Sequence, residues 1–411
     1  MHFYIDPGTG SMLFTILVGI LGAAIYSMRN ITMKLRFVLS GGKAEKTNSN
    51  TIPFAVFTDS KRYWNVFEPI CDEFEKRGLD MVYYTASEDD PALSKNYTHV
   101  KREFAGEGNK AFAKLNMLNA TILLSSTPGL DVYQWKRSRD VKYYVHIPHA
   151  VSDLSGYRMF GLDYYDAVLL TGDYQYHQIR DLEKLRNLPE KELLTVGMTY
   201  MDTLKKRLES APALEKHPIT VLLAPSWGIN SIFNRYGDKI FNELLKTGYN
   251  IIVRPHPQSY VSEKELIESL MKKFPDSERI QWNRDNDNFD VLRKSDIIIS
   301  DFSGVIFDFS LVFDKPVIYA DTSFDKSPYD SCWLDEELWT FQILPFIGQQ
   351  LTADNLENIK DIIDTCLSNT KYKQGRDKAR SESWACIGES AVKVVDYLEN
   401  KYKDLTAEIN D

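Results

Sequence analysis

The segment of residues 295–320, SDIIISDFSGVIFDFSLVFDKPVIYA, constrains the fold more than any other part of the chain. Residues 297–299 form an isoleucine run without polar alternation, which is typical of a parallel strand covered on both faces. The nearly continuous apolar residues at 305–313 predict a buried helix, and Pro316 separates it from a second strand at 317–319. Strand, helix and strand in this order form a βαβ unit, which requires a parallel sheet.

The turn inside this unit has the composition of an anion site. Asp301 follows the first strand, and Ser303 is expected to cap the helix. The free N–H groups and the positive end of the helix dipole would then face the carboxyl edge of the sheet, where ligands bind in open α/β folds. The alternative is that Asp301 and Ser303 only cap a core helix.

The overall composition limits the classes of function. The chain has 411 residues, enough for two domains, and 49 Lys and Arg against 58 Asp and Glu give a net charge of −9, which argues against a generic nucleic-acid binder. The sequence contains no HExxH, His/Cys cluster, Walker loop or GxGxxG, so we expect no protein metal site. Four scattered cysteines predict reduced thiols in a cytoplasmic compartment: Cys71, Cys332, Cys366 and Cys386.

Residues 11–28 carry no charge and predict a membrane-spanning helix. At about 1.5 Å per residue, such a run just crosses a hydrocarbon core about 30 Å thick. Positive residues follow the run and none precede it, so the positive-inside rule places residues 1–10 outside and the rest of the chain in the cytoplasm. An in-plane anchor or a packed N-terminal helix is the alternative. Residues 29–50 read as a basic and polar linker.

Two α/β domains are expected after this linker, at 51–212 and 213–402, with a polar tail at 403–411. The linker-like segment 209–218 separates them. Strands are predicted at 54–58, 81–85, 121–125, 143–147, 167–171, 193–197, 220–224 and 250–254, besides those of the βαβ unit. Helices are predicted at 64–77, 109–119, 200–208, 238–246, 262–273, 353–367 and 389–401. The pattern indicates two Rossmann-like domains that face one cleft.

Three turns of the second domain should share one edge of its sheet: residues 224–227, 254–257 and 300–304. Arg254 offers a bidentate cation for phosphate, and His256 a donor or a proton carrier. We therefore predict a phosphate site at this edge. The competing interpretation is that RPHP is a rigid turn with a surface arginine and histidine.

These motifs resemble the CDP-glycerol glycerophosphotransferase family. The resemblance covers about residues 140–320, and it rests on ordered motifs: LAPSW at 223–227, RPHP at 254–257, SDFSGVIFD at 300–308, KPVIY at 315–319, HAVS at 149–152, YYD at 164–166 and TVG at 195–197 with Asp202. The family comprises teichoic-acid-type primases and polymerases of bacterial cell-wall or capsule synthesis. The resemblance implies the two-domain glycosyltransferase-B (GT-B) architecture.

The resemblance also implies a reaction. An alditol phosphate, in the first place glycerol phosphate, would pass from a CDP-activated donor to a hydroxyl of a cell-surface polymer or lipid-linked precursor, with release of CMP. His149 would be the general base and His256 a second catalytic residue. The implied substrate-binding residues are Ser226, Arg254, Asp301, Ser303 and Gly304. No protein-bound cofactor is implied, although Mg²⁺ can accompany the donor diphosphate.

Departures from the family pattern leave alternatives open. Many members carry Trp-His-Gly-Thr where this chain has Val-His-Ile-Pro-His at 145–149, so His146 competes with His149 as the base. Trp227 and Asp308 are further candidates for substrate contact. Gly228 and Gly304 replace an arginine and a serine, which leaves the donor open.

Other functions remain open as well. The alternatives are a nucleotide-sugar glycosyltransferase of the same architecture, a nucleotide-sugar 2-epimerase, and an inactive membrane-tethered scaffold. The acceptor, the number of units added and the oligomeric state are not specified by the sequence.

Overall fold

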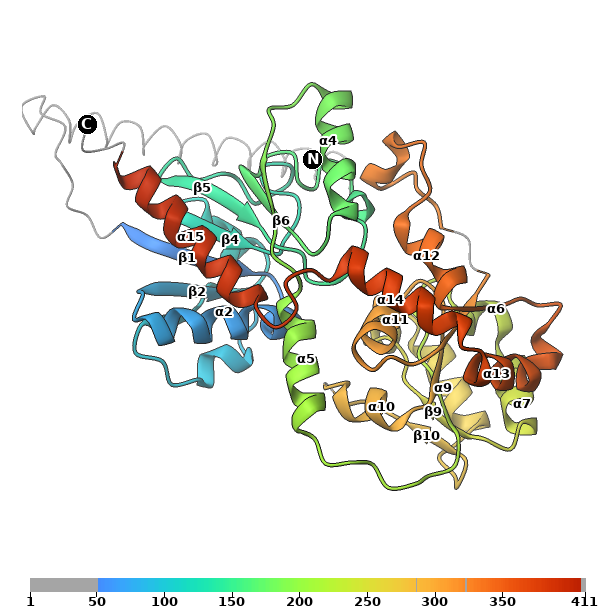
Figure 1. The fold of residues 1–411 in the computed structure, drawn as a ribbon. Coiled ribbons are helices and arrows are strands. Elements are labelled where there is room, and N and C mark those ends of the chain that lie inside the picture. The colour runs from blue at the N-terminus through green and yellow to red at the C-terminus, as the bar shows by residue number, and fades with distance from the viewer. Residues whose placement is uncertain (1–50, 286, 322–323, 408–411) are drawn as a thin grey trace, which may run out of the picture. The chain divides into compact units, whose positions relative to one another are not determined.

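Two parallel β-sheets organise the computed structural model, which describes residues 51–285, 287–321 and 324–407 (Figure 1). The first sheet has the strand order β3-β2-β1-β4-β5-β6-β7, and each neighbouring pair is parallel. Its strands are β1 (Ile52–Thr58), β2 (Met81–Thr85), β3 (Val100–Phe104), β4 (Ala120–Ser125), β5 (Val141–His146), β6 (Ala167–Leu170) and β7 (Glu192–Thr195).

The second sheet has the order β10-β9-β8-β11-β12-β13, again with parallel pairs throughout. Its strands are β8 (Thr220–Leu223), β9 (Asn250–Val253), β10 (Ile280–Trp282), β11 (Ile297–Ser300), β12 (Val317–Ala320) and β13 (Gly348–Leu351). The prediction of two parallel-sheet α/β domains is therefore confirmed for the described residues.

The predicted βαβ unit is present, but its helix is irregular. All of β11 is buried, and Ile298 pairs with Val317 of β12. One α-helical turn, α11 (Val305–Phe307), continues as a π-helical segment, η4 (Asp308–Val312). Gly304 occupies the N-cap position and no side chain caps the helix, so the expected capping by Ser303 is wrong. π-Helical turns are rare and occur often at functional sites.

Helices cover both faces of the sheets. Those that follow strands of the first sheet are α2 (Trp64–Arg77), α3 (Asn109–Leu115), α4 (Tyr174–Arg186) and α5 (Thr199–Ser210). Those of the second half are α6 (Ile232–Tyr236), α7 (Asp238–Lys246), α8 (Ser259–Ser262), α9 (Lys264–Lys273), α10 (Phe289–Lys294), α12 (Trp339–Ile347), α13 (Ile359–Ser368) and α14 (Lys371–Ser383). Short 3₁₀ turns are η1 (Lys61–Tyr63), η2 (Pro91–Ser94), η3 (Leu154–Gly156), η5 (Asp330–Trp333) and η6 (Leu356–Asn358).

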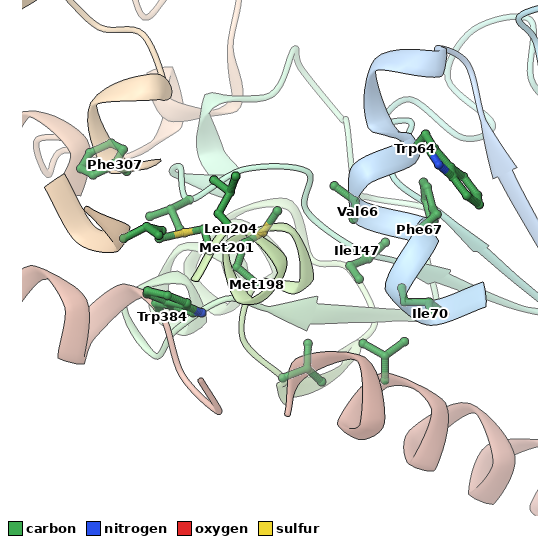
Figure 2. Close-up of a cluster of buried hydrophobic side chains, with 14 of the residues drawn as sticks. Trp64, Val66, Phe67, Ile70, Ile147, Met198, Met201, Leu204, Phe307 and Trp384 are labelled. Carbon is green, nitrogen blue, oxygen red and sulfur yellow. The ribbon is translucent and has the colours of Figure 1, made fainter. Parts of the chain in front are cut away.

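Helix α5 is central to the packing. Figure 2 shows Met201 between the α2 side chains Val66 and Phe67 on one side and Phe307 on the other. These residues belong to one continuous cluster of buried apolar side chains, to which Trp384 also contributes. Burial of apolar side chains is the main favourable term in folding, so this cluster joins the elements of both sheets.

The last helix, α15 (Ser390–Ala407), packs on elements of the first sheet (Figure 1). Arg77 of α2 donates to Asp396 at 2.7 Å and to Glu399 at 3.0 Å. The expected second domain, 213–402, thus contains a helix whose partners lie in the first half. The same helix continues to Ala407, within the segment 403–411 that was expected to be a polar tail.

The predicted membrane-spanning segment, residues 11–28, lies outside the described residues, as do residues 1–10 and 29–50. Among the helices that are described, none is both long and apolar enough to cross a membrane.

Asp153 connects the two halves of the described chain. It follows β5 in the first half, and its buried carboxylate accepts the backbone N–H groups of Trp339 at 2.8 Å and Thr340 at 2.9 Å. The Thr340 hydroxyl donates to the same carboxylate at 2.6 Å. Asp153 therefore satisfies the first N–H groups of α12, which have no partner within the helix.

We predict that Asp153→Ala lowers the free energy of unfolding by about 2–4 kcal/mol, because it leaves these buried donors unpaired. Urea denaturation followed by circular dichroism measures the change. Asp181→Ala, at an exposed position of α4, is the matched control and should change stability by less than about 0.5 kcal/mol. Equal stabilities of the two variants would contradict the role given to Asp153.

Candidate functional site

The three predicted turns follow adjacent strands of the second sheet. The backbone N–H of Ala224 donates to Ile299 at 2.9 Å, and that of Arg254 donates to Leu223 at 2.8 Å. These bonds continue the β8–β11 and β8–β9 ladders past the ends of the strands. The expected common edge is therefore confirmed, and residues 224–227, 254–257 and 300–304 lie along it.

Arg254 presents a half-buried cation at this edge. Its guanidinium donates to the side chain of Asn283, and no carboxylate of the described residues lies within ion-pair distance. Burial lowers the pKa of Arg254, while the charges of Asp285 and Asp287 oppose this change. A half-buried guanidinium with free donors favours an anionic ligand.

His256 is held as a neutral donor. Its Nδ1 accepts the backbone N–H of Gln258 at 3.1 Å, so the proton of the neutral ring lies on Nε2. Burial lowers the pKa of His256, and the positive charge of Arg62 lowers it further. At neutral pH, the ring therefore offers one N–H without carrying a charge.

Asp301 connects two of the turns. Its fully buried carboxylate accepts the N–H groups of Ser226 at 2.8 Å, Ile232 at 3.2 Å and Phe302 at 2.8 Å. Burial raises the pKa of Asp301, and these N–H groups oppose the change. Asp301 thus fixes the shape of the edge, whereas the buried hydroxyl of Ser226 has no hydrogen-bond partner.

The turn before α11 presents unpaired backbone donors. The described part of the chain supplies no acceptor for the N–H groups of Ser303, Gly304 and Val305. Gly304 is exposed, and the side chain of Ser303 is half-buried. Although Ser303 does not cap the helix, the positive end of α11 and η4 therefore remains available to an anion.

Two histidines lie at the carboxyl edge of the first sheet. His146 ends β5, is fully buried, and has its Nε2 3.2 Å from the hydroxyl of Tyr157. His149 is only partly buried, and its ring lies 4.3 Å from that of Tyr63. Burial lowers the pKa of His149 to about 4 and that of His146 to about 3. Both rings are therefore neutral at pH 7, and His149 is the more accessible one.

Tyr63 and Tyr157 contact His149, and the charge of Asp59 acts on both tyrosines. The sequence analysis did not single out Asp59 or Tyr63 as site residues. Asp59 follows β1, and burial raises its pKa. Burial and the charge of Asp59 together raise the pKa of Tyr63 to about 12. Burial likewise raises the pKa of Tyr157, with the charge of Asp59 adding to it. Asp59 could have been found, because it follows a strand just as the turns of the second domain do.

The edges of the two sheets meet at Gly304. A Cβ atom built on Gly304 would lie 3.8 Å from the Cβ of Ala150, the residue after His149. The structure thus brings Ala150, which follows His149 in the chain, next to the turn that carries the free N–H groups.

Asp308 and Trp227 are the remaining candidates. Asp308 is in η4 beside Asn288 and Tyr200, and burial raises its pKa to about 7. Trp227 is 47% exposed and lies at the carboxyl edge of the second sheet. Within the described ranges, no group of three or more His, Cys, Asp or Glu side chains is arranged to hold a metal ion.

Comparisons with known proteins show the family and the fold of this chain. Residues 42–400 match the family described as CDP-glycerol:poly(glycerophosphate) glycerophosphotransferase. A structure of the wall teichoic acid polymerase TagF soaked with CDPG is similar, with a TM-score of 0.57, 13% identity, and coverage of 96% of this chain and 99% of that one. A search of curated proteins gave no significant match.

Other solved structures share the fold as well. The complex of S. aureus MnaA with UDP has a TM-score of 0.58 at 12% identity, covering 86% of this chain and 97% of that one. A putative UDP-N-acetylglucosamine 2-epimerase from Listeria monocytogenes has a TM-score of 0.53 at 13% identity, with coverage of 84% and 95%. At such identities the likeness shows a two-domain, GT-B-like fold and no particular chemistry. Because the family match spans most of the sequence, however, the chain belongs to the CDP-glycerol:poly(glycerophosphate) glycerophosphotransferases and is an enzyme of that type.

Proposed function

We propose that this enzyme transfers glycerol phosphate from CDP-glycerol to a hydroxyl of a cell-surface polymer or lipid-linked precursor and releases CMP. The observation that carries the proposal is the approach of Gly304, whose backbone N–H is unpaired, to Ala150, the residue after the neutral His149. The family match and the CDPG named for the TagF structure support the choice of donor.

The carboxyl edge of the second sheet, called the second edge below, would hold the donor diphosphate. Arg254 supplies a cation with free N–H groups, His256 supplies its Nε2–H, and Gly304 supplies a backbone N–H. Such preorganised donors stabilise the negative charge that grows on the leaving phosphate. Asp301 shapes this edge without touching the donor, because its carboxylate already accepts three N–H groups.

The carboxyl edge of the first sheet, called the first edge below, would supply the base. The acceptor oxygen attacks the β-phosphorus of CDP-glycerol while the bond from this phosphorus to the bridging oxygen breaks, and CMP leaves with the electron pair of that bond. The imidazole of His149 takes the proton of the acceptor hydroxyl. We assign the base to His149 and not to His146, because His146 is fully buried and its Nε2 is occupied by Tyr157.

The surroundings of the reaction also belong to this proposal. The uncharged run at 11–28 would anchor the chain in the cell membrane as a single span, with both α/β domains in the cytoplasm. The acceptor would then be reached at the membrane surface. Mg²⁺ would accompany the donor diphosphate, held mainly by phosphate oxygens and water.

The test is turnover by the full-length protein of CDP-glycerol, CDP-ribitol and UDP-N-acetylglucosamine, with CMP or UDP release as the readout. Release of CMP from CDP-glycerol that depends on added acceptor is the expected result. Release of UDP would instead indicate a sugar transferase, and a failure to bind any of these nucleotides would indicate a scaffold.

We predict that His149→Gln lowers kcat by about 10²–10⁴-fold, because it removes the proton acceptor. KM for CDP-glycerol should change by less than about threefold, since the donor residues lie on the other sheet. His177→Gln, an exposed position of α4, is the matched control and should retain full activity. Full activity of His149→Gln would refute the assignment.

We also predict an unusually low acidic limit of activity. His149 acts as a base only when neutral, and burial lowers its pKa from an ordinary 6.5 to about 4. As the pH falls, kcat/KM should therefore stay constant through pH 6.5 and decline only as it approaches about 4. Initial rates between pH 4 and 8 test this, with preincubated samples returned to pH 7 to exclude unfolding. A decline centred near pH 6.5 would show that His149 titrates normally.

A further inference from the structure

Phe160 has a strained backbone. Its φ is +65°, in the left-handed region, which bulky residues adopt only when their surroundings enforce it. The neighbouring Gly161 has no room for a side chain, because a Cβ there would lie 2.9 Å from the carbonyl oxygen of Arg158. The backbone conformation of the tight turn at residues 157–161 is therefore stable only if contacts with other parts of the chain stabilise it.

Asp330 of the second half supplies this support. Its carboxylate accepts the backbone N–H of Phe160 at 2.7 Å and that of Gly161 at 3.3 Å. Its own backbone N–H donates to the carbonyl of Tyr157 at 2.9 Å. Asp330 is only 1% exposed, so its side of the contact with the turn is shielded from water.

The charge of Asp330 is balanced by Arg186 of α4. Arg186 donates to Asp330 and also to Asp163, the latter at 2.7 Å. Its guanidinium carbon lies 4.9 Å from the ring centre of Phe160 and 5.2 Å from that of Trp333. Because these groups are largely buried, the carboxylate is held in one place, as its contact with two backbone N–H groups requires.

The turn leads directly to the two histidines. The hydroxyl of Tyr157, its first residue, lies 3.2 Å from Nε2 of His146. The ring of Tyr157 also lies 6.3 Å from that of His149. The side chain of Tyr157 thus contacts both histidine rings, and its backbone carbonyl accepts a hydrogen bond from Asp330.

From this chain of contacts we infer that Asp330 is a positioning residue for the reaction. It lies outside the donor edge, and it sets the place of Tyr157 and, through it, of the histidines. The inference rests on the proposed role of His149 as the base. It means that the base, carried by the first half, is held in place by a carboxylate of the second half.

The test compares Asp330→Ala, Tyr157→Leu, which removes both the hydroxyl and the ring that contact the histidines, and their combination in the full-length protein. Each single variant should lower kcat by about 10–100-fold and leave KM for CDP-glycerol within about threefold. Because both act through one contact chain, the double variant should be no slower than the slower single variant. Effects on kcat that multiply, or an unchanged kcat in either single variant, would overturn the inference.

The matched control is Asp163→Ala, which removes the other carboxylate partner of Arg186 but no contact with the N–H groups of the turn. It should lower the melting temperature and leave kcat within about threefold. An equal loss of kcat in Asp163→Ala would reduce Asp330 to a stabilising residue. If Asp330→Ala does not fold, Asp330→Asn, which keeps one acceptor for Phe160 and loses the acceptor for Gly161, replaces it with a smaller expected loss of kcat of about 3–10-fold, and an unchanged kcat would overturn the inference.

A readout without turnover separates this inference from the proposed function. The ¹⁵N resonances of the His146 and His149 rings should shift in Asp330→Ala and stay in place in Asp163→Ala. Shifted resonances in an enzyme that does not use CDP-glycerol would refute the proposed function alone. Unshifted resonances would refute the positioning role.

Discussion

The candidate site depends on one buried carboxylate, that of Asp301. It accepts N–H groups from Ser226, Ile232 and Phe302, and so connects the turn after β8 to the turn after β11. A buried carboxylate without such partners would cost several kcal/mol, so the turns must keep the positions that satisfy it. Arg254 and His256 follow the neighbouring strand β9 and lie beside this fixed frame.

The two sheets contribute different chemistry. The second edge offers N–H donors, and no carboxylate of the described residues forms an ion pair with Arg254, which suits the diphosphate of a nucleotide donor. The first edge offers two imidazoles that burial keeps neutral. A neutral ring can accept a proton, and the absence of its charge keeps it from competing with Arg254 for the phosphate. Two aspartates connect the halves of the chain. Asp153 of the first half accepts the backbone N–H of Trp339, and Asp330 of the second half accepts that of Phe160.

The sequence predicted the parts of the fold in which local pattern and burial agree. The isoleucine run of β11 and the amphipathic α2 were found because their environment is uniform along their length. The edge strand β3, VKREF, was missed because its polar residues look like a loop, and β10 and β13 are too short to show a pattern. The donor-side turns were predictable from strand order alone. The roles of Asp330 and Tyr157 were not, because their contacts join residues far apart in the chain.

The most direct measurement of the central claim is a crystal structure of the full-length protein with CDP-glycerol. The account predicts the β-phosphate within about 3 Å of both the Nε2 of His256 and the N–H of Gly304, with His149 facing the phosphorus from the other side. A diphosphate bound elsewhere would contradict it. One such place is the open cavity between residues 212–217 and β10, which lies away from both histidines of the first edge.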